Sequence, residues 1–133
     1  LFKQCFLSEL VNNNVDLTPE QYLLIDLLWD EGPLTQQQIA DQMQKDKNSI
    51  TKLIDGLEKK GYVIRETNTE DRRKNLVVVT KMGEGKKQEI TRIAINAADN
   101  ILGGIPLVEL NTVVEVLNKL NRNMKNLLKK NQE

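Results

Sequence analysis

Two short amphipathic patterns joined by a polar turn occupy residues 34–61, and this pairing constrains the fold more than any other stretch. The apolar residues of the first pattern recur near the helical spacing of 3.6, and they are Leu34, Ile39, Ala40 and Met43. Those of the second pattern also share one stripe, and they are Ile50, Leu53, Ile54 and Leu57. Thr35 and Gln38 form a capping-box pattern, Asp46 suits an N-cap, and Gly61 suits a left-handed helix end. We therefore expect two helices packed on each other.

The polar side chains of the second pattern crowd into its first two turns. They are Lys47, Asn48, Ser49, Thr51 and Lys52. In a helix-turn-helix, this end of the second helix points into the major groove of DNA. The simpler alternative is a solvated outer face, because packed helix pairs with polar surfaces occur in most α-rich domains and the turn geometry decides between the two.

Two β-rich runs follow, YVIRE at 62–66 and LVVVT at 76–80, and the polar segment TNTEDRRKN joins them. This pattern predicts a β-hairpin. Its loop carries Arg72, Arg73 and Lys74, and a narrow cationic arm suits the negative potential of a minor groove. Helix, turn, helix and basic hairpin is the element order of a winged helix, although a hairpin loop of this composition also serves solubility alone.

These residues resemble the core of the MarR family (multiple antibiotic resistance regulator family). The resemblance runs from Leu17 to Gly85 and rests on LTPEQY, LTQQQIA, TKLIDGLEKKGYVIR, the wing triplet Asp71-Arg72-Arg73, and LVVVTKMG. It implies a mainly α (α+β) fold over residues 1–133. Residues 17–85 would form a winged helix-turn-helix core with a β-hairpin wing, and residues 1–16 and 86–133 a helical dimerisation region.

The segments before residue 34 and after residue 80 are also predicted to be helical. Residues 1–11 carry an apolar stripe with Phe2, Phe6 and Leu10, and Thr18 begins a helix of which Trp29 should join the core. Thr80 should cap a helix over 81–102, and Gly103-Gly104 and Pro106 require a turn before a last helix from Leu107 to Leu128. One chain has too little core to cover both long helices, so we expect a homodimer. The alternative is that they pack on each other in a monomer.

Composition narrows the chemistry. The formal net charge is 0, but residues 45–87 hold twelve Lys or Arg against seven Asp or Glu, a local excess of +5. The absence of histidine and the single cysteine exclude the usual zinc sets, Ser-His-Asp catalysis and an intrachain disulfide. We therefore expect no metal, no cofactor and no enzymatic activity. The lack of a long apolar run and of a signal-peptide pattern predicts no membrane segment and a reducing, cytoplasmic location.

Cys5 invites a redox hypothesis, since some relatives of the resembled family sense peroxides through a cysteine on the first helix. It lies only thirteen positions before Thr18, nearer than that subgroup implies. A lone cysteine on an apolar stripe is more often a small buried hydrophobe, which is the interpretation we prefer.

The combined prediction is a sequence-specific transcriptional regulator, most simply a repressor, that binds double-stranded DNA as a homodimer. Asn48 would read a base edge, and Lys47 and Lys52 would contact guanine or phosphate. The phosphate contacts of the preceding helix would come from Thr35, Gln36 and Gln37.

By resemblance, Arg73 would enter the minor groove, Asp71 would brace the wing through Arg65, and Arg72 and Lys74 would attract the backbone. Two-fold symmetry predicts a palindromic site with half-sites about 10 bp apart. The family commonly releases DNA on binding a small aromatic or phenolic effector, but the sequence names no residues for such a ligand. The alternative from another class is a winged-helix module that binds proteins and lacks specific DNA binding.

Overall fold

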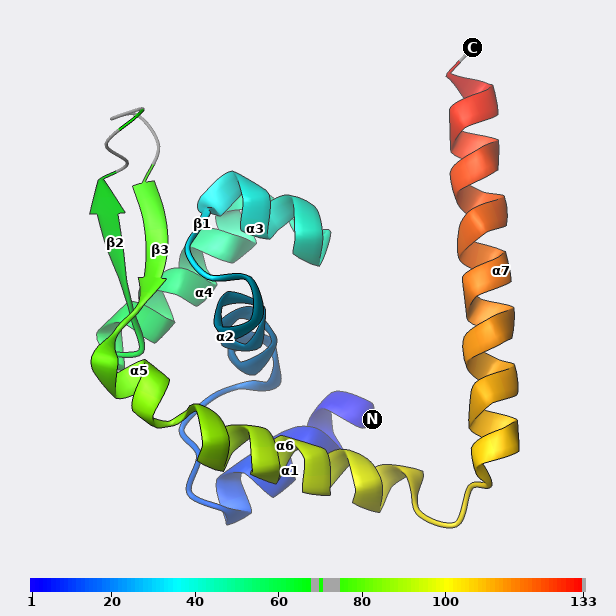
Figure 1. The fold of residues 1–133 in the computed structure, drawn as a ribbon, viewed down its shortest axis with the longest axis horizontal. Helices are drawn as coiled ribbons and strands as arrows, with labels where there is room; N and C mark the ends of the chain where they lie inside the picture. The colour runs from blue at the N-terminus through cyan, green and yellow to red at the C-terminus, as the bar shows by residue number, and fades with distance from the viewer. Residues whose placement is uncertain (68–69, 71–74, 133) are drawn as a thin grey trace. The chain divides into compact units, whose positions relative to one another are not determined.

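A computed structural model describes residues 1–67, 70 and 75–132, and these fall into two compact units, Leu1–Asp99 and Asn100–Glu133. The first unit contains most of the elements (Figure 1). They are α1 (Phe2–Asn12), α2 (Pro19–Glu31), β1 (Leu34–Thr35), α3 (Gln36–Met43), α4 (Lys47–Lys59), β2 (Val63–Thr67), β3 (Asn75–Val79), α5 (Lys81–Gly85) and most of α6 (Lys87–Leu102). The winged helix arrangement predicted from the sequence is confirmed.

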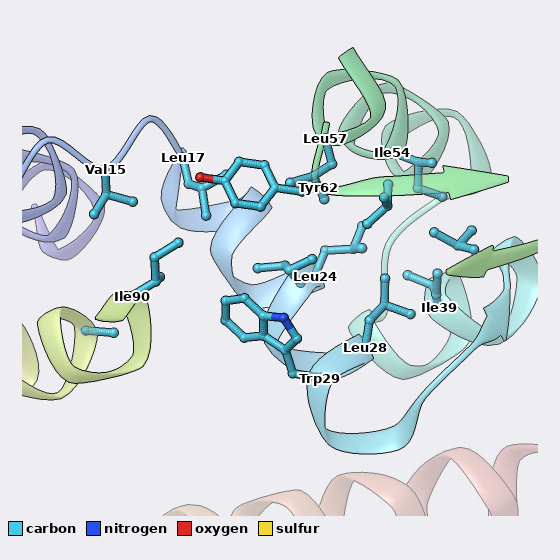
Figure 2. Close-up of a cluster of buried hydrophobic side chains, with 14 of the residues drawn as sticks. Val15, Leu17, Leu24, Leu28, Trp29, Ile39, Ile54, Leu57, Tyr62 and Ile90 are labelled. Atoms are coloured by element: carbon cyan, nitrogen blue, oxygen red, sulfur yellow. The ribbon is translucent and has the colours of Figure 1, made fainter. Parts of the chain in front are cut away.

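Helix α2 forms the centre of the first unit and contacts α1, α4 and β3. It begins as predicted: Thr18 accepts from the Gln21 backbone N–H at 3.1 Å, and the Gln21 side chain accepts from the Thr18 backbone N–H at 3.1 Å. Leu24 is fully buried, and Figure 2 shows it between the rings of Tyr62 and Trp29. Trp29 joins the core as predicted, and its Nε1 donates to the backbone oxygen of Gly83 at 3.3 Å.

The sheet has three antiparallel strands in the order β1-β3-β2. The hairpin pairs Val63 with Val79 and Thr67 with Asn75, as expected for the two β-rich runs. Strand β1 was not predicted: Leu34 pairs with Val77 and does not belong to the next helix. The reason is that Thr35 has the extended backbone of an N-cap residue, so the helix begins only at Gln36.

The single helix predicted over residues 81–102 is wrong, because it is divided into α5 and α6 at Lys86. Thr80 caps α5 as expected, accepting from the Gly83 backbone N–H at 3.1 Å. The Lys86 N–H bonds the carbonyl oxygen of Gly83 at 3.3 Å, a tight terminal turn. Glycine is a poor helix former, and Gly83 and Gly85 both fall within this one short helix, which favours the break.

Helix α1 directs Phe6 and Leu10 into the core, but Phe2 is exposed. The expectation that Cys5 is buried is also wrong, since this free thiol is exposed. Cys5 lies about 100° around the helix from Phe6, so the stripe that buries Phe6 and Leu10 turns Cys5 away from it.

The second unit contains the last helix, α7 (Leu107–Asn131), which follows a turn with Gly104 at φ +81°. No residue of α7 is buried. Its exposed apolar side chains include Val113, Val114, Leu117, Leu120, Met124, Leu127 and Leu128. Across residues 1–67, 70 and 75–132, no single helix is long and apolar enough to cross a membrane.

Candidate nucleic-acid interface

The turn between α3 and α4 has the compact form that a helix-turn-helix requires. Helix α3 ends at Gln44, which adopts a left-handed conformation with φ +53°, and Lys45 N–H then bonds the carbonyl oxygen of Ala40 at 3.1 Å. Asp46 caps α4 by accepting from the Ser49 backbone N–H at 3.2 Å. The Ser49 hydroxyl also donates to Asp46 Oδ1, and this bond, followed by the one from the Ser49 N–H, lowers the pKa of the Asp46 carboxyl below its ordinary value. Only three residues therefore separate the two helices.

Helix α4 presents one apolar and one polar face. Ile50, Ile54 and Leu57 are fully buried against the rest of the unit. On the other side Lys47, Asn48 and Lys52 are exposed, while Ser49 and Thr51 are half-buried. Because Lys47, Asn48 and Lys52 all lie within the first two turns, the N-terminal half of α4 carries a solvent-facing polar surface that can reach a groove.

The polar residues at the start of α3 are already engaged with the protein. Thr35 accepts from the Gln38 N–H at 3.1 Å in a capping box, and Gln37 donates to Asp41 at 2.9 Å. Gln36 Nε2 donates to Thr51 Oγ1 at 3.1 Å, and that hydroxyl donates to the backbone oxygen of Lys47 at 2.9 Å. The structure thus joins two of the predicted DNA contacts, Gln36 and Thr51, to each other.

The hairpin is fixed to α4 through Arg65 on β2. Its guanidinium lies 2.7 Å from Asp55 Oδ1 and 2.8 Å from Glu58 Oε1, and its Nε donates to Gln36 Oε1 at 3.1 Å. These partners were not predicted from the sequence, although Asp55 and Glu58 are three residues apart on one helix and could have indicated a paired carboxylate site. The predicted wing-tip residues lie outside the described residues. They are Asp71, Arg72, Arg73 and Lys74.

A second polar cluster holds the C-terminal end of α4, and the sequence analysis did not identify it. Lys60 Nζ donates to Gln21 Oε1 at 2.8 Å and also to the backbone oxygen of Asp16, while the Tyr62 hydroxyl donates to Asp16 Oδ1 at 2.8 Å. Burial, and then the hydrogen bond with Asp16, raise the pKa of Tyr62 well above its ordinary value. These contacts tie α4 to the α1–α2 connection and to the start of α2.

An apolar cavity of about 250 Å³ lies among α1, α2 and α6 within the first unit. Its lining residues are Phe2, Phe6, Pro19, Tyr22, Leu23, Ala94, Ile95 and Ala98. The rings of Phe6 and Tyr22 approach to 5.6 Å between centroids. Burial, and then the nearby carboxylate of Asp26, raise the pKa of Tyr22 above its ordinary value.

A capped helix-turn-helix, a polar second helix and an antiparallel hairpin define a winged helix-turn-helix protein of the DNA-binding class. Residues 17–74 match the model of the MarR family. The chain is 28% identical over 109 residues to the HTH-type transcriptional regulator MhqR of Bacillus subtilis, covering 82% of this chain and 75% of that one. It is 25% identical over 115 residues to the HTH-type transcriptional regulator MgrA of Staphylococcus aureus, covering 86% and 74%.

Solved structures agree with this fold. A mutant MarR from E. coli complexed with operator DNA superposes with a TM-score of 0.82 at 20% identity, covering 90% of this chain and 84% of that one. A transcriptional regulator from Pseudomonas aeruginosa superposes with a TM-score of 0.78 at 24% identity, covering 90% of both chains. The MarR family model therefore matches the winged helix-turn-helix core of the chain, and the chain is similar to DNA-binding transcriptional regulators of that kind. The relatives named here are regulators, not enzymes.

Proposed function

We propose that the chain is a homodimeric, sequence-specific repressor that binds a palindromic operator and leaves it when a small molecule binds. The observation that carries this proposal is the exposed polar surface at the start of α4, with Lys47, Asn48 and Lys52 opposite a fully buried apolar face. An asparagine amide can pair with an adenine edge, and lysine can bind guanine or phosphate.

The hydrogen bonds at the start of α3 refine the predicted contacts. Because the Gln36 and Thr51 side chains bond each other, we assign them the role of holding α3 against α4, with phosphate contact limited to the second amide hydrogen of Gln36. Lys47, Asn48 and Lys52 then carry the direct contacts in the major groove. The assignments of Ser49 and of the wing residues Asp71, Arg72, Arg73 and Lys74 remain predictions from sequence.

The exposed apolar stripe of helix α7 supports the proposal of a homodimer. Its apolar stripe repeats along 25 residues without burying one of them. A long apolar stripe exposed to water is typical of an association surface, and a second copy of the chain offers an identical stripe. A two-fold dimer explains a palindromic operator, since each subunit would read one half-site.

The test is selection of bound sequences from random duplex DNA by the purified chain at two salt concentrations. We expect an enriched palindrome with half-sites about 10 bp apart and affinity that falls steeply with salt. Salt-sensitive binding without an enriched sequence would contradict sequence-specific repression. Absence of binding at low salt would favour the protein-interaction module instead.

The cavity beside Phe6 and Tyr22 supports the proposal that a small-molecule effector binds the chain. At about 250 Å³ it is smaller than the roughly 300–1,000 Å³ of pockets for drug-sized ligands, which suits a molecule with one aromatic ring. The Tyr22 hydroxyl would fix the polar end. Such a ligand releases DNA only if it binds the non-binding arrangement more tightly than the binding one.

Ala98→Leu tests this site because it adds volume at the cavity wall. Titration calorimetry with phenol and with benzoate should detect binding to the parent chain and none to the variant, while both still bind the selected operator. Equal binding of these probes to the variant would exclude the cavity as the effector site. Asn96→Leu on the same helix, outside this cavity, is the matched control.

A further inference from the structure

Arg65 joins strand β2 of the hairpin to α3 and α4, the two helices that carry the proposed DNA contacts of the helix-turn-helix. It lies on β2, its guanidinium pairs with Asp55 and Glu58 on α4 at 2.7 and 2.8 Å, and its Nε donates to Gln36 on α3 at 3.1 Å. The side chain is only 20% exposed. A guanidinium presents its donors in a fixed planar fork, so several simultaneous partners define its position closely.

The connection continues beyond Gln36. The amide of Gln36 donates to Thr51 Oγ1, and that hydroxyl donates to the backbone oxygen of Lys47 in the first turn of α4. A continuous series of hydrogen bonds therefore runs from the hairpin, through the first turn of α3, to the end of α4 that carries Asn48. Each polar group in the series has a partner, which favours a single arrangement over several.

We propose that Arg65 is a positioning residue for DNA recognition, which fixes the offset between the hairpin and α4 so that both grooves are met in register. This inference rests on the proposed DNA-binding function. Contacts in a major groove and in the adjacent minor groove succeed together only if the two elements keep one spacing, and recognition side chains need support to within a fraction of an ångström. The two carboxylates also outweigh the single positive charge of Arg65, which leaves little attraction for phosphate.

A direct phosphate contact by Arg65 makes the opposite prediction for its partner. In that case Asp55→Asn removes a negative charge near DNA and tightens binding, and Arg65→Gln lowers the slope of log affinity against log salt by about 0.9. A positioning role requires both variants to weaken binding to the operator. It also requires that the salt slope stays unchanged, because no phosphate contact is lost.

The experiment measures affinity of the full chain for the selected operator and for an unrelated duplex. We expect Arg65→Gln and Asp55→Asn to lose at least about tenfold in operator affinity, equivalent to 1.4 kcal/mol, with little change on the unrelated duplex. Arg65→Lys keeps the charge but lacks the fork, so it should not restore the loss. The matched control is Lys59→Gln, which removes an exposed cation from α4, the helix that carries Asp55. Tighter operator binding by Asp55→Asn would overturn the proposal.

A measurement without DNA separates this inference from the proposed function. Spin labels are placed at Lys52→Cys on α4 and Glu66→Cys on β2, both exposed, in a Cys5→Ser background. The distance distribution between the labels should be narrow with Arg65 and should broaden with Arg65→Gln or Asp55→Asn. An unchanged distribution in both variants would overturn the positioning role even if the chain binds DNA. If the parent chain binds no DNA, the proposed function fails, and the label distances still decide whether Arg65 fixes the hairpin.

Discussion

The first unit, which contains the winged helix and is called the winged unit below, and helix α7 contain the same kind of amphipathic repeat. The apolar side chains of this repeat are buried in the winged unit and exposed in α7. In α4, Ile54 and Leu57 are fully buried, whereas Leu117 and Leu120 in α7 are 57% and 49% exposed. Burial of a leucine side chain is worth about 1.5–3 kcal/mol, so α4 gains stability inside one chain that α7 leaves unused.

This difference indicates what each repeat is for. An apolar stripe covered within the chain stabilises the domain and holds the opposite, polar face of the helix in place. An uncovered stripe gains nothing until another surface meets it. The apolar residues of α4 therefore stabilise the winged unit, whereas we expect those of α7 to stabilise the dimer. The following variants test this difference.

The largest effect should come from Leu24→Ala, because Leu24 is fully buried at the centre of the first unit. Loss of its contacts and the resulting cavity should lower the free energy of unfolding by about 2–5 kcal/mol. Leu23→Ala is the matched control, since Leu23 is the adjacent residue and is 55% exposed. Denaturant unfolding followed by circular dichroism measures both. Equal losses in the two variants would contradict the burial difference.

Gly83→Ala should destabilise the chain by about 1–3 kcal/mol through overpacking. An added Cβ would lie 2.5 Å from the backbone oxygen of Tyr62 and 2.7 Å from Val79 Cγ1. At Gly85 an added Cβ meets nothing within 4 Å, so Gly85→Ala should be neutral or slightly stabilising. Thermal unfolding of the two variants measures whether α5 packs closely against Tyr62 and Val79. A neutral Gly83→Ala would argue against it.

Tyr62→Phe should cost about 1 kcal/mol at neutral pH, because it removes the hydrogen bond to Asp16. Since the pKa of Tyr62 is raised in the folded chain, the folded state keeps the phenol proton after the unfolded state has lost it. Stability from Tyr62 is therefore present below the unfolded pKa of about 10 and is lost as the pH rises above it. The difference between parent and variant should shrink when unfolding is compared at pH 8 and at pH 10.5. Parallel pH dependence of the two proteins would refute the assigned shift.

The smallest effect on the stability of the winged unit should come from Leu117→Ser in α7, within about 0.5 kcal/mol for an exposed position. Its effect should appear in association: analytical ultracentrifugation should find a weaker dimer than for the parent. Asn118→Ser, at the exposed neighbouring position, is the control and should leave association unchanged. A dimer unaffected by Leu117→Ser would mean that the stripe of α7 is not the association surface.

The helix caps, the apolar stripes of the helices and the hairpin could be predicted from the sequence, because they depend on residues that are neighbours along the chain. The caps at Thr18, Thr35, Asp46 and Thr80 each bond a backbone N–H three residues later, so residue identity and spacing were sufficient. The helical stripes and the hairpin follow from periodicities of 3.6 and 2 in the same way. The resemblance to the MarR family and the exposure of Lys47, Asn48 and Lys52 on α4 were predictable for this reason.

The contacts between distant segments could not be predicted from the sequence, because they depend on how the elements pack. Strand β1 exists because Leu34 meets Val77, and the partners of Arg65 lie 7, 10 and 29 residues away, on elements brought together by packing. The exposure of Cys5 and the cavity beside Phe6 depend likewise on which helix covers which face. Local sequence specifies the preferences of each element, whereas the free energy of burying their apolar faces together selects which side chains finally meet.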